Sequence, residues 1–135
     1  MIPLQDPELA VQEAKRAVGE LSHRGLFISP HPVDNRNLDH QAYEPLWELA
    51  EQLNVPALVH VSTGIRLPTA GAERFDRYSL FHLHAHPFEQ MTAAASLILG
   101  GVLERHPRLR VGFMGGVFSP CCGRFPLQVF APNGC

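Results

Sequence analysis

The sequence predicts an α/β fold built on a parallel sheet. Segments with helical periodicity alternate with short apolar runs, in the order helix, strand, helix, strand, helix, strand. Parallel neighbours need a crossover of about a dozen residues, normally a helix, so this alternation favours parallel pairing over hairpins. The 135 residues suit one domain, and 45% hydrophobic residues with a net charge of −2 are typical of a globular chain. We therefore expect about three parallel strands and three helices.

The first helix is expected to follow Asp6. The stretch Asp6-Pro7-Glu8 supplies a capping side chain, a proline at the first helical position and an acid in the first turn. Apolar residues then recur at helical spacing as far as Leu21, which predicts about four turns. The apolar run at residues 25–28 predicts the first strand, and the Pro- and Asn-rich segment after it cannot continue a strand.

The second helix is expected to begin near Asp39, which could cap it, and to end at Leu53. Pro45 predicts an irregular first turn, since proline donates no backbone hydrogen bond. Residues 55–61, VPALVHV, then form the best strand candidate in the chain.

The third helix is expected to open at Pro87-Phe88-Glu89, because proline favours the first helical position. Its apolar residues recur at intervals of three and four as far as Val102, and His106-Pro107 is expected to end it. Residues 109–114 predict the third strand.

Histidines stand at every second position in SLFHLHAHPF: His82, His84 and His86. On a strand all of them would share one face, whereas on a helix only His82 and His86 would. Because the segment runs into the predicted helix start, we expect a loop at a pocket rim, with His84 and His86 as candidate substrate-binding residues. The alternative is a self-contained metal site with His60, since a loop of about twenty residues could fold back over the strand end.

His60 lies near the C-terminal end of the predicted second strand. A polar side chain among apolar residues needs a partner, and ligands bind at the carboxyl ends of parallel strands in open sheets and barrels. From the residues alone, a core imidazole bonded to a backbone carbonyl is the favoured interpretation.

The composition changes after Met114. Asp and Glu are frequent up to Glu104 and absent after it, and residues 115–135 show neither helical nor strand periodicity. We therefore divide the chain into a barrel-like segment, residues 1–114, and an atypical Gly/Pro/Cys-rich tail, residues 115–135, whose loss of acidic residues suggests a frameshift. All three cysteines lie in this tail and are expected to be unpaired thiols.

Several partner classes are not indicated by the sequence. It contains no run of about 18 apolar residues, no secretion signal and no basic stripe. We therefore expect a cytoplasmic protein that binds a small-molecule substrate, and neither nucleic acid nor a membrane.

Longer phrases follow one another in a characteristic order: DPELAVQEAKRAVGELSHRGLFI, LDHQAYEPLWELAEQLNVPALVHVSTG and ASLILGGVLERHPRLRVGF. Over about residues 3–114 the chain resembles the decarboxylase branch of the metal-dependent amidohydrolase superfamily, which includes aminocarboxymuconate-semialdehyde and γ-resorcylate decarboxylases. The resemblance implies a distorted (β/α)8 TIM barrel of about 300 residues, of which this chain would be a fragment from the third helix to the sixth strand.

The resemblance also implies one divalent metal, usually zinc, at the C-terminal mouth of the barrel. A His-x-His pair on the first strand, a histidine ending the fifth and an aspartate ending the eighth would hold it, and His60 matches the fifth-strand ligand. The pair and the aspartate would lie outside residues 1–135. The family's catalytic His or Glu after the sixth strand is matched by Gly115 and Gly116, so no catalytic residue is identified.

The implied activity is hydrolysis or nonoxidative decarboxylation of a small carboxylate or cyclic substrate, with the metal as Lewis acid and water activator. Because zinc sites with an open position take about three protein ligands, we expect this chain alone to be inactive and to bind no metal tightly. Unpaired strand edges predict self-association. The alternative is a noncatalytic truncated protein or assembly module without a metal site.

Overall fold

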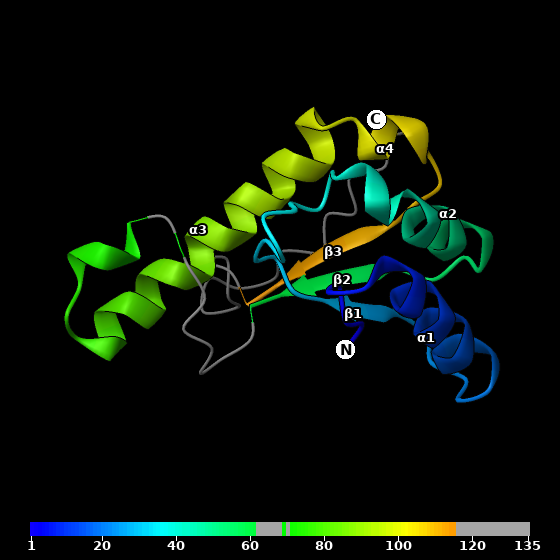
Figure 1. Cartoon of the computed structure of the whole chain (residues 1–135), viewed down its shortest axis with the longest axis horizontal. Coiled ribbons are helices and arrows are strands. Elements are labelled where there is room, and N and C mark those ends of the chain that lie inside the picture. The colour runs from blue at the N-terminus through cyan, green and yellow to red at the C-terminus, as the bar shows by residue number, and fades with distance from the viewer. Residues whose placement is uncertain (62–68, 70, 116–135) are drawn as a thin grey trace, which may run out of the picture.

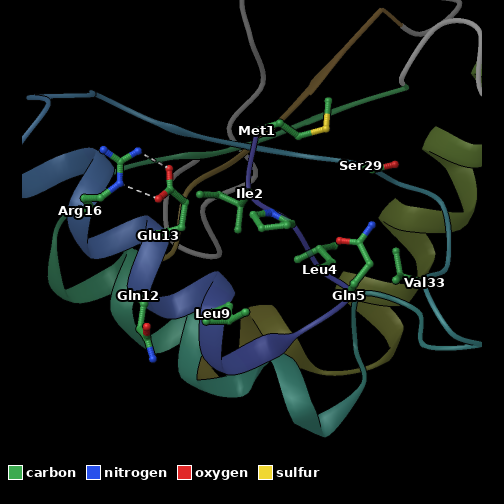
Figure 2. A pocket seen from close by; sticks show the side chains of 11 residues that line it. Met1, Ile2, Leu4, Gln5, Leu9, Gln12, Glu13, Arg16, Ser29 and Val33 are labelled. Atoms are coloured by element: carbon green, nitrogen blue, oxygen red, sulfur yellow. Dashed lines mark hydrogen bonds and ion pairs between the residues drawn. The ribbon is translucent and has the colours of Figure 1, made fainter.

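A parallel sheet lies at the centre of the molecule, shown in Figure 1 as a computed structural model that describes residues 1–61, 69 and 71–115. The strands are β1 (Leu26–Ile28), β2 (Ala57–His60) and β3 (Val111–Met114), in the order β1-β2-β3. Both pairings are parallel. The α/β class and the predicted parallel strands are confirmed, whereas the predicted tail lies outside the described residues except for Gly115.

Helices connect the strands and cover one face of the sheet (Figure 1). They are α1 (Pro7–Gly19), α2 (Glu44–Gln52), α3 (Tyr78–Leu99) and α4 (Val102–Arg105), with short 3₁₀ turns η1 (Gln41–Tyr43) and η2 (Ala72–Arg74). The Asp6 carboxylate accepts hydrogen bonds from the backbone N–H groups of Glu8 and Leu9, at 3.0 and 3.1 Å, which confirms the predicted cap of α1. Within the described part of the chain, no helix is both long and apolar enough to cross a membrane.

The core lies between the sheet and α1 and α2. Trp47 and Tyr43 are fully buried there, and each satisfies its polar atom through a backbone carbonyl. The indole Nε1–H of Trp47 donates to Leu38 O at 3.0 Å, and the Tyr43 hydroxyl donates to Leu4 O at 3.1 Å. These bonds tie α2 and η1 to the segments that precede them.

The start of the second helix differs from the prediction. The irregular first turn is present as η1, but Asp39 as its cap was wrong, because the His40 Nδ1 atom accepts the backbone N–H of Ala42 at 3.2 Å. Asp39 instead contacts α3: its carboxylate accepts the hydroxyl of Ser96, whose Oγ accepts the Asp39 N–H at 3.0 Å. Asp39 was predicted to cap a nearby helix, but it bonds instead to the Ser96 hydroxyl, which is distant in sequence.

The third helix begins nine residues earlier than the sequence suggested, at Tyr78, so Pro87 lies inside it. The prediction of a loop for His82, His84 and His86 was therefore wrong, because all three lie in α3. Proline is compatible with a first turn, but here the burial of Ala85, Gln90 and other α3 residues outweighs the one backbone hydrogen bond it removes. The helix also ends earlier, at Leu99, because Gly101 adopts a left-handed conformation with φ +76° and α4 starts afresh.

Replacing Trp47 with alanine is expected to destabilise the fold by about 3–5 kcal/mol, because it leaves a cavity and an unsatisfied carbonyl at Leu38. Urea unfolding followed by circular dichroism measures the change. Leu53→Ala is the control, since Leu53 follows the same helix and is 37% exposed, and it should cost less than about 1 kcal/mol. Equal losses in both variants would contradict the assignment of Trp47 to the core.

Candidate functional site

The candidate site lies at the carboxyl end of the sheet. The strands end there at Ile28, His60 and Met114, and the N-terminal half of α3 extends past them (Figure 1). In parallel α/β folds this end carries ligand sites, because the loops that leave the strands converge there.

His60 lies on the face of the sheet that α1 and α2 leave uncovered. Side chains alternate along β2, so Ala57 and Val59 are buried in the core while Leu58 and His60 are half-buried on the opposite face. The His60 ring lies 5.5 Å from the ring of Phe27 on β1, centroid to centroid. His60 therefore has the geometry that strand alternation predicts, and it does not pack beneath the helix that contains Trp47.

Gly115 forms one wall around the His60 imidazole. It follows β3 with φ +73°, a conformation that side chains other than glycine rarely adopt. A Cβ atom there would lie 2.6 Å from His60 Nε2, well inside contact distance. Glycine at this position therefore lets the main chain approach the imidazole directly.

A second pair of imidazoles comes from α3. The His86 ring lies 6.4 Å from the His60 ring and nearly perpendicular to it, and the His82 ring lies 4.1 Å from that of His86. His86 Nδ1 is 2.9 Å from the His82 carbonyl oxygen, which can only accept, so Nδ1 carries the proton. In the neutral ring, Nε2 of His86 is then left as a hydrogen-bond acceptor.

His31, just after β1, is a site residue that the sequence analysis missed. It is buried, and its Nδ1 atom lies 3.3 Å from the hydroxyl of Ser29. Burial lowers the pKa of the His31 imidazole, and neighbouring His86 lowers it further, which favours the neutral ring at neutral pH. The signal that could have found it is its position directly after a predicted parallel strand.

Gln90 joins the ends of two strands and was also missed. Its side-chain Nε2 donates to the carbonyls of Val59 and Met114, at 3.1 and 2.8 Å. The side chain is buried, and its Oε1 atom has no hydrogen-bond partner among the described residues. Gln90 therefore fixes the spacing of β2 and β3 beside His60, and an amide in an apolar helical stripe gave no sequence signal for this role.

Glu89, next to Gln90, is a buried acid with 4% of its surface exposed. Burial raises its pKa above the usual 4.5, and a hydrogen bond with Thr69 acts in the opposite direction. The carboxyl group is thus biased toward its neutral form inside α3.

His84 lies apart from His82 and His86. Its ring stacks on Phe88 at 4.1 Å and contacts Phe75 at 5.2 Å, and a Cβ atom on Gly71 would lie 2.9 Å from its Nε2. Helical spacing thus divides the triplet between two sides of α3. Of the two predicted substrate-binding residues, the structure brings His86 to His60 and places His84 in an aromatic cluster of its own.

The described residues do not complete a metal site. Across residues 1–61 and 71–115, no three His, Cys, Asp or Glu side chains are grouped so that they could hold an ion. A catalytic zinc site takes about three protein ligands, so His60 is not a metal site by itself. The geometry gives no support to a self-contained site of His60 with the triplet.

Residues 1–114 match the family described as amidohydrolase. The chain belongs to this family. The 2-amino-3-carboxymuconate-6-semialdehyde decarboxylase of Dictyostelium discoideum is 34% identical over 91% of the chain, which spans 33% of that protein. The γ-resorcylate decarboxylase of Polaromonas sp. is 32% identical over 84% of the chain, which spans 37% of it. The chain thus spans about a third of the length of these relatives.

Solved structures show the same relation. An amidohydrolase from Mycobacterium avium subsp. paratuberculosis superposes with a TM-score of 0.69 at 26% identity, over 83% of this chain and 30% of that one. A dihydroxybenzoic acid decarboxylase from Polaromonas sp. JS666, solved with manganese and 2-nitroresorcinol, superposes with a TM-score of 0.63 at 25% identity. The match covers 84% of this chain and 35% of that one. These neighbours are TIM barrels, so the predicted partial (β/α)8 architecture is confirmed.

Gly115→Ala is expected to lower the free energy of unfolding by about 1–2 kcal/mol, because alanine is strained in the left-handed backbone conformation at this position. The added Cβ atom should also displace the His60 ring. Urea unfolding measures the stability, and side-chain NMR signals of His60 report the displacement. Gly19→Ala is the matched control, because a Cβ atom on Gly19 would meet nothing within 4 Å. It should leave the His60 signals in place and stabilise α1 by up to about 1 kcal/mol. Unchanged His60 signals in Gly115→Ala would contradict the contact.

Glu89→Gln is expected to stabilise the protein at about pH 7 and to matter less near pH 4. A carboxyl group whose pKa rises on folding contributes stability at low pH and loses it as the pH increases from 4.5 through the folded pKa. Urea unfolding at a series of pH values measures this, with exposed Glu104→Gln as the control that should change nothing. A destabilised Glu89→Gln at neutral pH would show that the charged form is the one the fold requires.

Proposed function

We propose that residues 1–114 form part of the barrel of a metal-dependent decarboxylase or hydrolase that acts on a small carboxylate or cyclic substrate. Membership of the amidohydrolase family supports the metal-dependent class, and the Dictyostelium and Polaromonas relatives support decarboxylation. The observation that carries the proposal is the position of His60, whose half-buried imidazole lies on the open face of the sheet at the carboxyl end of β2.

In this proposal His60 is one metal ligand. Its ring is held between Phe27 and the glycine after β3, so it is oriented before any ion binds. Imidazole is a common zinc ligand, and the manganese in the Polaromonas structure widens the proposal to divalent ions in general. The remaining ligands would come from outside the described residues.

His86 is proposed to line the substrate pocket. Its ring neighbours that of His60, and its Nδ1 proton is committed to the His82 carbonyl, which leaves Nε2 toward other partners. A neutral Nε2 can accept a proton from a substrate hydroxyl, and a protonated one can donate to a carboxylate. The role predicted for His84 stays a prediction, because its contacts are with Phe75 and Phe88.

A noncatalytic module is the second candidate. The observation that favours it is the lack of a three-ligand group within residues 1–61 and 71–115. The two proposals differ in what His60 does when the rest of a barrel is supplied. If the chain is part of an enzyme, His60 binds a metal ion there; if it is a noncatalytic module, His60 binds none.

The isolated chain is expected to bind zinc or manganese no more tightly than about micromolar, because one imidazole cannot replace about three ligands. Isothermal titration of the wild type, His60→Ala and His84→Ala measures this. Submicromolar binding near one-to-one that both substitutions abolish would show instead a self-contained site of His60 with the triplet.

A chimera tests the proposed function itself. Residues 1–114 replace the matching segment of the Dictyostelium decarboxylase, which then supplies the missing strands. We expect the chimera to bind a divalent ion, with affinity reduced about tenfold or more by His60→Ala and unaffected by His23→Ala at an exposed position after α1. Metal analysis and substrate decarboxylation are the readouts, and full metal retention in His60→Ala would favour the noncatalytic module.

A further inference from the structure

Two histidines on the N-terminal half of α3 form a pair of their own beside the sheet. His82 and His86 lie four residues apart on a helix with about 3.6 residues per turn, so both side chains leave the same face of α3. Their rings are 4.1 Å apart, centroid to centroid, and both residues are half-buried. His84 leaves another side of the helix, where its ring stacks on Phe88. The pair is therefore a unit of two imidazoles and not part of a three-residue cluster.

The His86 ring has the form that a metal ion needs. Its Nδ1 atom donates to the backbone carbonyl of His82 at 2.9 Å, which leaves the lone pair on Nε2. Histidines that bind metals commonly donate their other ring N–H to a carbonyl or carboxylate, because that bond fixes the tautomer and the direction of the ring. Here the carbonyl belongs to the other histidine of the pair, so folding of the helix orients His86 before an ion arrives.

The His82 ring is oriented by stacking. It lies 5.6 Å from the ring of Tyr78, one turn earlier on the same face, with an interplanar angle of 25°. An ion bonded to both histidines at about 2.0–2.1 Å would hold the two ring centres about 5 Å apart. Rotation about the Cβ–Cγ bond of histidine is soft, so the His82 ring can supply the remaining ~1 Å at low cost.

We propose that His82 and His86 together bind one divalent transition-metal ion, with copper(II) preferred and nickel(II) and zinc(II) next. Two histidines four residues apart on one helix face are a known arrangement for holding zinc. The general order of affinity places copper(II) above nickel(II) and zinc(II), and manganese(II) lowest. Two side chains leave the other coordination positions to water, so copper should bind with about micromolar affinity. A two-ligand site also agrees with the absence of a three-ligand group within residues 1–61 and 71–115.

This site is distinct from the ligand role proposed for His60. The His60 ring comes from β2 and lies 6.4 Å from that of His86, whereas both ligands of the pair belong to one helix. The Nε2 atom of His86 is the one that the proposed function directs toward substrate, so an ion and a substrate would compete for it. The pair is tested on the chain alone and His60 in the chimera, so either proposal can fail without the other.

Isothermal titration of copper(II), nickel(II), zinc(II) and manganese(II) into the 135-residue chain measures the affinity. We expect one copper ion per chain, nickel and zinc weaker by about tenfold or more, and no detectable manganese binding. The tail cysteines are replaced by serine in every protein, because thiolates also bind these ions. They are Cys121, Cys122 and Cys135.

Single substitutions assign the ligands. His82→Ala and His86→Ala should each weaken copper binding by about tenfold or more, because one imidazole then remains. His84→Ala, on the same helix, and His60→Ala are the matched controls and should change the affinity by less than about twofold. Circular dichroism checks that each variant folds.

A transplanted pair separates loss of a ligand from loss of structure. Tyr78 is 51% exposed and contacts His82 one turn earlier on α3. Tyr78→His in the His86→Ala background restores two histidines four residues apart, and should return copper binding to within about threefold of the original affinity.

Electron paramagnetic resonance of the bound copper(II) counts the imidazoles that ligate it. We expect two in the chain with all its histidines, and one in His82→Ala or His86→Ala. Copper binding that persists in both variants, an equal loss in His84→Ala or His60→Ala, no recovery in the transplanted pair, or any number of imidazoles other than two would overturn the proposal.

Discussion

The parallel pairing of β2 with a strand on each side is the constraint from which the rest of the structure follows. Parallel neighbours cannot be joined by tight turns, so a helix must cross between each pair, and α1 and α2 bury one face of the sheet together. The strands then end at one edge and present alternate residues on the uncovered face. His60 owes both its exposure and its neighbours to this arrangement.

Helix α3 links that edge to the core by two sets of polar contacts. Ser96 bonds to Asp39 in the segment after β1, and Gln90 bonds to the carbonyls that end β2 and β3. The Gln90 contacts connect α3 to the ends of β2 and β3, and the His86 ring lies 6.4 Å from the His60 ring beside them. A helix bonded to the strand ends can position a side chain more closely than a loop could, which is why the helical placement of His86 matters for the site.

Buried polar groups are concentrated at the carboxyl end of the sheet. His31, Glu89 and Gln90 are each more than nine-tenths buried, and two of them have pKa values moved by burial toward the neutral form. Burying such groups carries a free-energy cost that apolar residues of similar size would avoid. His31 neighbours His86, and Gln90 bonds to the carbonyls that end β2 and β3, so these two buried groups lie at the same end of the sheet as His60.

The sequence by itself determined the α/β class, the three strands, the cap at Asp6 and the strand position of His60, because these depend on periodicity and on contacts between near neighbours. The tertiary structure decided the partner of Asp39, the start of α3 and the separation of His84 from His86. In each case a contact from more than fifty residues away, or burial against the sheet, outweighed a local preference such as proline at a helix start. Gln90 could not be found from spacing, since the backbone carbonyls that give it its role meet it only in the folded chain. His31 follows a predicted strand, but its neighbour His86 meets it only in the folded chain.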